Sequence, residues 1–307
     1  MKSSNIGGQA VIEGIMMKNG DAYAVAVRKQ NGEIVLQRED YNSIIKWKKL
    51  TKIPFIRGVF NFIDSMVLGM KTLTYSASFF EEEEEVLTTA EQKEKKEKQE
   101  KFIMGATVAF SIVLAIGIFM VLPYFLSGLL SKTVTSQAVR AIIEGVVRLL
   151  IFVGYVLLIS QMKDIKRVFM YHGAEHKCIN CIETGKELTV ENVRNSSKQH
   201  KRCGTSFLLF VMLVSIILFF FIRVDSPVLR VVIRIALVPV IAGISYELIK
   251  WAGNSDNPIV GVLSKPGLWL QKLTTKEPED DMIEVAIEAV ESVFDWKQYL
   301  ENSQQEV

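Results

Sequence analysis

The chain has 307 residues, 49% of them hydrophobic, and a formal net charge of +2. A charge this small, without a basic patch interleaved with aromatic residues, excludes nucleic acid as an expected partner. The opening residues MKSSNIGGQAVIEG lack the charged start, apolar stretch and cleavage site of a signal peptide. Three cysteines, an odd number, argue against a disulfide framework, and a cytosolic placement would keep them as thiols available to a metal.

The N-terminal residues predict a small β-structure. AYAVAVRKQNGEIVLQRE contains two alternating segments around Asn31-Gly32, which is a strong hairpin signal. GGQAVIEG, at Gly7–Gly14, lacks the preceding strand and the following Lys-Ser/Thr of a phosphate loop. We therefore expect Gly7–Gly14 to provide tight backbone packing beside the hairpin rather than a ligand site.

Residues 54–80 predict an amphipathic helix, followed by a charged stretch. Pro54–Phe80 is apolar except for polar residues that share one helical face: Arg57, Asn61, Asp64 and Lys71. This pattern indicates an interfacial or re-entrant helix. A fifth membrane span is the alternative, but it would place the next charged segment on the wrong side. The runs EEEEE and EQKEKKEKQEK predict a solvated helix or a flexible linker.

Four stretches are long and apolar enough to cross a bilayer core of about 30 Å. They are Phe102–Leu122, Ala141–Ser160, Thr205–Ile222 and Val228–Ile249. Pro123 predicts a kink or break after the first of them. The segment before the first span and the loop Gln161–Gly204 carry most of the flanking Lys and Arg residues, which places both termini and this loop in the cytosol.

After the last span, residues 257–278 fit a segment lying on lipid headgroups. Asp280–Val293 predicts a helix with one apolar face and acidic residues at its start, which suits the helix macrodipole. This helix needs a partner surface, either the hairpin or the central loop.

The expected fold class is an all-α integral membrane protein. It has four transmembrane helices, an interfacial or re-entrant helix, a small N-terminal β-hairpin and a cytosolic His/Cys-containing loop. Seven segments follow: 1–53 with the hairpin, 54–80 with the amphipathic helix, 81–101 as charged linker, 102–160 with two spans, 161–204 as metal-site loop, 205–250 with two spans, and 251–307 as a C-terminal cytosolic amphipathic segment.

All three histidines and all three cysteines lie between residues 172 and 203. His172 and His176 are four residues apart, so both imidazoles can reach one ion from a helix. With Glu175 they spell H-x-x-E-H, the inverted zincin pattern. In such a motif two imidazoles hold zinc, a third ligand comes from elsewhere, and the glutamate takes a proton from the attacking water.

A closed structural zinc site is the rival interpretation. Cys178-x2-Cys181 followed by His200-x2-Cys203 has the paired spacing of such sites. Four protein ligands would saturate the ion, and one chain could hold both kinds of site. Glu247, at the cytosolic end of the fourth span, could complete a metal shell or pair with Lys250 or a headgroup.

Charged residues also fall within the spans. Glu144 and Arg148 lie near the outer end of the second span, and Arg230 and Arg234 near the outer start of the fourth. Buried charges are costly in a bilayer, so we expect a Glu144–Arg234 pair at similar depth. The pair could fix helix packing or line a polar path for a substrate.

Six motifs together resemble a known family. They are GGQAVIEGIMM, RGVFNFIDSMVLGMK, YHGAEHKCIN, ELTVENVR, HKRCGTSFLL and PGLWLQKLTTKEPEDDMIEVAI. The chain resembles the YqhQ family, a bacterial group of multi-pass membrane proteins predicted to be metal-dependent enzymes. This resemblance implies a protein of the bacterial inner membrane.

The resemblance also bears on the ligand set. The family's H-G-A-E-H falls on His172, Glu175 and His176, and its H-x-R-C-G-T begins at His200 and includes Cys203. Family members commonly carry threonine at the position of Cys178 and lack Cys181. The resemblance therefore favours His172, His176 and one of His200 or Cys203 as ligands, with Glu175 as base.

Two function hypotheses follow. The first is a zinc-dependent hydrolase or peptidase, or one using another divalent transition metal, at the cytosolic face of the inner membrane. Its substrate would be a membrane-proximal peptide, a lipid or a lipid-linked group. The second is a non-enzymatic membrane scaffold or regulator with a structural zinc site, which would dock other membrane proteins. The expected partners are the lipid bilayer and a membrane protein; a transporter is a weaker third reading.

Overall fold

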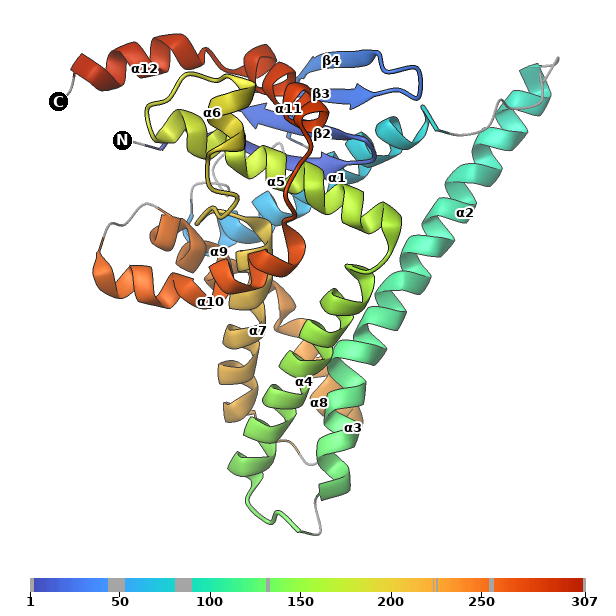
Figure 1. Cartoon of the computed structure of the whole chain (residues 1–307). Coiled ribbons are helices and arrows are strands. Elements are labelled where there is room, and N and C mark those ends of the chain that lie inside the picture. The colour runs from blue at the N-terminus through green and yellow to red at the C-terminus, as the bar shows by residue number, and fades with distance from the viewer. Residues whose placement is uncertain are drawn as a thin grey trace. The chain divides into compact units, whose positions relative to one another are not determined.

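The computed structural model describes residues 3–43, 53–80, 90–130, 133–222, 224, 226–253 and 257–305 (Figure 1). The predicted EEEEE run lies outside the described residues. The chain forms two compact units. One comprises Met1–Phe80, Val156–Val214 and Val238–Val307, and the other comprises Glu81–Tyr155 and Ser215–Leu237.

A four-stranded antiparallel sheet forms in the first unit. The strands lie in the order β1 (Gly7–Val11), β2 (Gly14–Asn19), β3 (Ala22–Arg28) and β4 (Ile34–Asp40). The predicted hairpin is confirmed as β3–β4, with Gly32 at a φ of 87° in its turn. The expectation of a lone hairpin is wrong, because GGQAVIEG supplies β1 and the start of β2. Gly14 is required there, since a Cβ would lie 2.3 Å from the Ala26 carbonyl oxygen.

Two helices cover one face of this sheet. They are α5 (Lys163–Glu183) and α11 (Asp280–Val293), accompanied by α6 (Val190–Arg194) and α12 (Trp296–Gln305) (Figure 1). The core between them includes the fully buried Met17, Tyr171, Ile179 and Met282. The predicted apolar face of α11 is confirmed, and its partners are β2, β3 and α5.

Helix α1 (Ile56–Ala77) turns its polar stripe toward the protein. It is one continuous helix that packs on α9 (Val238–Gly253) and on the other face of the sheet. The polar residues contact protein groups: Arg57 with Glu247, Asn61 with the Tyr246 hydroxyl and Lys71 with Glu39. The opposite face leaves apolar side chains 41–54% exposed: Ile63, Met66, Val67 and Met70. Within the described residues α1 is not among the helices that could cross a membrane.

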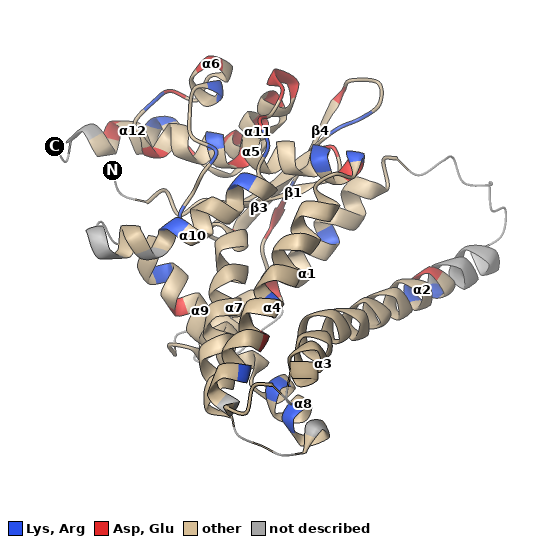
Figure 2. Ribbon diagram, turned by 60° about the horizontal axis from the view of Figure 1, so that its bottom comes forward, with Lys and Arg blue, Asp and Glu red and all other residues tan. Residues whose placement is uncertain are grey.

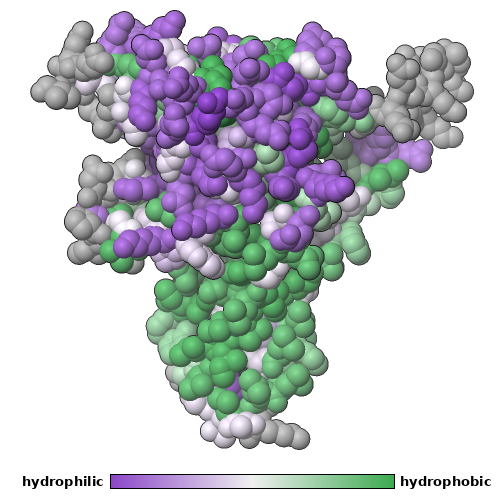
Figure 3. All heavy atoms as spheres, in the orientation of Figure 1, coloured by the Kyte–Doolittle hydropathy of each residue, from purple (hydrophilic) through white to green (hydrophobic). Residues whose placement is uncertain are grey.

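Up to four helical segments in the described residues are candidates for membrane spans. Lys98–Leu129, Ala138–Ile159 and Gly204–Phe221 are long and apolar enough to cross a membrane, and a fourth span results if the bent pair Val228–Ala236 and Val238–Gly253 is counted as one. These spans comprise α2 (Ala90–Ile116), η2 (Gly117–Val121), α3 (Leu122–Leu129), α4 (Gln137–Ile159), α7 (Gly204–Phe221), α8 (Pro227–Ala236) and α9. The apolar parts of these helices form a hydrophobic surface (Figure 3), whereas charged residues are most frequent on the elements around the sheet, with others on the first part of α2 and on α8 (Figure 2).

Two prolines account for the bend and the π-helical turn in these helices. The predicted continuous fourth span is bent by 41° at Leu237, because Pro239 has no N–H to donate to the carbonyl of Ile235. Before Pro123 the helix widens into the π-helical turn η2 and then continues as α3, so the predicted kink takes this form. The EQKEKKEKQEK run is the first part of helix α2.

Two helices lie next to the candidate spans in the sequence. The histidine motif lies on a helix separate from α4, because α4 ends at Ile159 and α5 begins at Lys163. Residues after the last span form helix α10 (Pro258–Thr274), which exposes Trp269.

Candidate metal centre

Helix α5 brings His172 and His176 onto one face. Their ring centroids lie 4.4 Å apart, as the four-residue spacing predicts. The Nδ1 atom of His172 lies 2.9 Å from the carbonyl oxygen of Thr274, and Nδ1 of His176 lies 2.8 Å from that of Lys198. A carbonyl can only accept, so Nδ1 is the donor in each pair, and in a neutral imidazole this tautomer leaves the Nε2 lone pair free for a metal. This second hydrogen bond orients metal-binding histidines in many proteins.

Cys203 joins the two imidazoles from the segment that precedes α7. Its Sγ lies 3.3 Å from the Nε2 of His172, and it also accepts a hydrogen bond from the Thr205 N–H. One ligand atom from each of His172, His176 and Cys203 lies within 4.8 Å of the others. A tetrahedral zinc ion with usual bond lengths separates its N and S ligands by about 3.3–3.6 Å. The donor set and its spacing therefore fit zinc after small side-chain adjustments.

Glu175 is buried beside this group. Its side chain packs against β1: a Cβ on Gly8 would lie 2.9 Å from Glu175 Cδ, and a backbone hydrogen bond from Gly8 to the carboxyl favours its charged form. The Oε2 atom of Glu175 is buried without a hydrogen-bond partner in the described part of the chain. Burial raises the pKa of this carboxyl, and the neighbouring His172 opposes the shift.

A strap formed by Thr274–Pro278 crosses α5 at Gly173. The Lys276 N–H donates to the Phe169 carbonyl at 2.8 Å. A Cβ on Gly173 would lie 2.0 Å from the Lys276 carbonyl oxygen, so the glycine of the H-G-A-E-H motif permits this crossing. The strap places the Thr274 carbonyl oxygen within hydrogen-bond distance of Nδ1 of His172. Sequence reasoning missed Thr274, Lys198 and Gly8, because carbonyl and N–H groups have no residue signature.

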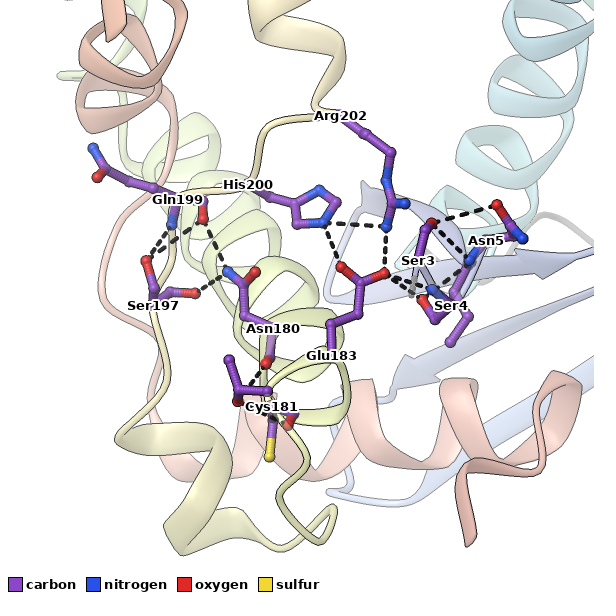
Figure 4. A network of polar contacts seen from close by, with 12 residues as sticks. Ser3, Ser4, Asn5, Asn180, Cys181, Glu183, Ser197, Gln199, His200 and Arg202 are labelled. Carbon is purple, nitrogen blue, oxygen red and sulfur yellow. Dashed lines mark hydrogen bonds and ion pairs between the residues drawn. The ribbon is translucent and has the colours of Figure 1, made fainter. Parts of the chain in front are cut away.

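His200 points into a different network. Its Nε2 lies 3.4 Å from a carboxylate oxygen of Glu183, which also binds Arg202 and accepts two hydrogen bonds from Ser4 (Figure 4). Burial raises the pKa of Glu183, but the hydrogen bonds from His200 and Ser4 and the charge of Arg202 outweigh it and lower the pKa to about 2. The His200 and His176 ring centroids are 5.8 Å apart. Of the two candidates for third ligand, the structure thus brings Cys203 to the histidine pair.

The remaining predicted site residues are engaged elsewhere. Cys178 is fully buried in the core against the sheet, where burial raises its pKa, and Cys181 donates to the Glu187 carbonyl at 3.3 Å. Glu247, which the sequence offered either as a further metal ligand or as a partner of Lys250 or a headgroup, forms a two-point ion pair with Arg57 and is not part of the histidine–cysteine group. Among the described residues, the one group of at least three side chains placed to hold a metal is His172, His176 and Cys203.

Comparisons with known proteins agree with the resemblance of the motifs. A family model described as "Protein of unknown function (DUF1385)" matches residues 53–296. The chain is 37% identical over 293 residues to "Uncharacterized protein YqhQ" of Bacillus subtilis (strain 168), with 92% of this chain and 90% of the relative covered. No solved structure matches.

Proposed function

Since the chain belongs to the DUF1385 family, together with YqhQ of Bacillus subtilis, we propose that it is a zinc-dependent hydrolase of the bacterial inner membrane, with its site on the cytosolic side. The observation that carries the proposal is the convergence of two imidazole nitrogens and the Cys203 sulfur, with the buried Glu175 three residues after His172 on the same helix. Three protein ligands leave a coordination position open, which is typical of catalytic rather than structural zinc.

The proposed roles follow from the chemistry of each group. His172, His176 and Cys203 would hold the ion, whose Lewis acidity would polarise the bond to be cleaved. Glu175 would accept a proton from the water that attacks the substrate carbonyl, and would then deliver that proton to the leaving group. The Oε2 atom of Glu175, which has no hydrogen-bond partner among the described residues, would offer the lone pair that accepts this proton. The Gly8 N–H would fix the carboxylate's orientation.

Membrane attachment would select a substrate close to the bilayer. The candidate spans, the exposed apolar face of α1 and the exposed Trp269 on α10 support an embedded protein whose α1 lies in the interface. The excess of Lys and Arg before the first span and between residues 161 and 204 supports a cytosolic site. Substrates would be a membrane-proximal peptide, a lipid or a lipid-linked group.

Metal content and coordination test the first half of this proposal. The chain is purified in detergent, its metals are measured by elemental analysis, and the zinc environment is read by X-ray absorption. We expect one zinc per chain with two nitrogen ligands, one sulfur ligand and one further light atom. A shell with two or more sulfurs and no exchangeable position would contradict an open site.

The Glu175→Gln variant tests the second half. Fluorogenic peptide and ester libraries presented in mixed micelles provide the turnover assay. The variant should keep its zinc and lose turnover, because an amide cannot accept the proton. Turnover equal to that of the wild type would show that Glu175 is not the base.

The second candidate is a membrane scaffold with a structural zinc site. It is favoured by one observation, namely that the three ligands tie α5 to the segment that leads into α7. In that case metal removal would lower the unfolding temperature, the libraries would give no turnover, and Glu175→Gln would behave as the wild type in binding a membrane-protein partner.

A further inference from the structure

The second compact unit contains three neighbouring arginines and one glutamate, so the positive charges outnumber the negative ones. Glu144 and Arg148 lie on α4, and Arg230 and Arg234 lie on α8. Glu144, Arg148 and Arg234 are only 3–5% exposed. The predicted Glu144–Arg234 pair is confirmed, with 2.9 Å between Arg234 NH2 and Glu144 Oε2. Three guanidinium groups and one carboxylate give this arginine cluster a net charge of +2.

Arg148 is fully partnered. Its Nε donates to the Phe119 carbonyl at 2.8 Å, its NH2 group to Glu144 at 2.7 Å and its NH1 group to Ser215 at 3.4 Å. The Phe119 carbonyl is available because residue 123, which would donate to it in a regular helix, is a proline. This arginine is therefore held in place by protein groups alone.

Arg234 is only partly partnered. Both of its terminal nitrogens face Glu144, which it shares with Arg148. Its Nε atom is buried and has no hydrogen-bond partner among the described residues. A buried charged donor left unpaired is destabilising, so a ligand that accepts from it would be favoured.

Arg230 lies beside Arg234 and has no carboxylate partner in the part of the chain that the structure describes. The two guanidiniums share one aromatic ring, with centroid distances to Tyr124 of 5.0 Å for Arg230 and 5.7 Å for Arg234. Arg230 donates to the Val224 carbonyl, which is a neutral acceptor. Two like charges therefore approach the same ring, and no carboxylate of the described residues lies between them as a partner of Arg230.

We propose that Arg230 and Arg234, seated on Tyr124, form a binding site for a phosphate-type oxyanion. Guanidinium groups bind phosphate oxygens through paired, charge-assisted hydrogen bonds. The apolar surface of the surrounding helices points to the headgroup of an anionic phospholipid as the source, and free phosphate is the other source with the same chemistry. This site is separate from the metal centre and does not depend on the proposed hydrolase activity.

Lipid-dependent stability tests the site. The full chain is purified in detergent and its apparent unfolding temperature is measured with phosphatidylglycerol, with phosphatidylcholine at equal mole fraction, or with inorganic phosphate alone. We expect phosphatidylglycerol to raise this temperature by about 5 °C, and phosphatidylcholine to have little effect. Arg230→Gln, which leaves every Glu144 ion pair intact, should lose most of the rise. Arg140→Gln removes an arginine of α4 outside the cluster and should keep it.

The outcomes separate clearly. An equal rise with phosphate alone would support the site and assign a free anion as its ligand. No rise with either anion, an equal rise with phosphatidylcholine, or an unchanged rise in Arg230→Gln would overturn the proposal. Native mass spectrometry of the wild type gives a second measurement that needs no variant: phosphatidylglycerol should remain bound at a collision energy that strips phosphatidylcholine, and equal retention would also overturn it.

Discussion

Replacing Gly173 by alanine should weaken metal binding without removing any ligand. The added Cβ would lie 2.0 Å from the Lys276 carbonyl oxygen, whereas ordinary contacts begin at 3.4 Å, so the strap must retreat by more than an ångström. That movement would stretch the Lys276–Phe169 hydrogen bond and withdraw the Thr274 carbonyl from His172. Overpacking of this kind costs about 1–3 kcal/mol of stability. Loss of a hydrogen bond that orients a metal ligand typically lowers metal affinity about 10–100-fold.

Competition with a chromophoric zinc chelator measures this affinity. Gly154→Ala is the matched control, because Gly154 also lies within a helix and nothing occupies the 4 Å around its Cβ position. The control should bind zinc as the wild type does. If Gly173→Ala also retained wild-type affinity while folded, the strap would not orient His172 and this account of the site would be refuted.

Three shorter predictions follow from the contacts. Cys203→Ser should lose most of the zinc by elemental analysis, whereas Cys178→Ser, which alters a core thiol, should keep it; equal loss would contradict the ligand assignment. The lowered pKa of Glu183 stabilises the fold by ~3 kcal/mol above pH 4.5, and this contribution should disappear as the pH falls toward 2. The unfolding temperature of Glu183→Gln should therefore depend less on pH between 4.5 and 2 than that of the wild type. An equal pH dependence in the two proteins would show that Glu183 does not stabilise the fold in this way. Glu144→Gln should destabilise by about 3–5 kcal/mol, since it leaves the Arg234 charge buried without a carboxylate; a shift below 1 kcal/mol in chemical unfolding would count against the ion pair.

Hydropathy and periodicity predicted much of this fold. The long apolar helices, the β3–β4 hairpin and the apolar face of α11 follow from the spacing of apolar residues along the chain. The orientation of α1 could not be predicted in this way. Its stripe of polar residues was compatible with solvent, but Arg57 and Lys71 instead find carboxylates on α9 and β4, and only the tertiary arrangement reveals those partners.

The candidate site was also predictable only in part. Helical spacing predicted the pairing of His172 and His176, and the Cys203 segment was marked as a source of the third ligand. The choice between His200 and Cys203 could not be made from spacing, because it depends on Glu183, which draws His200 away. The break at Leu237, in contrast, had a readable signal in Pro239.

The strap between α10 and α11 makes the C-terminal part of the chain essential to a site whose ligands all lie before it. A protein truncated at residue 273 would retain both imidazoles and the thiol, yet it would lack the carbonyl group that fixes the first imidazole and the helix that closes the core behind α5. The proposed metal affinity should therefore be measured on the intact chain, because deletion variants designed around the ligand residues alone would lack both supports.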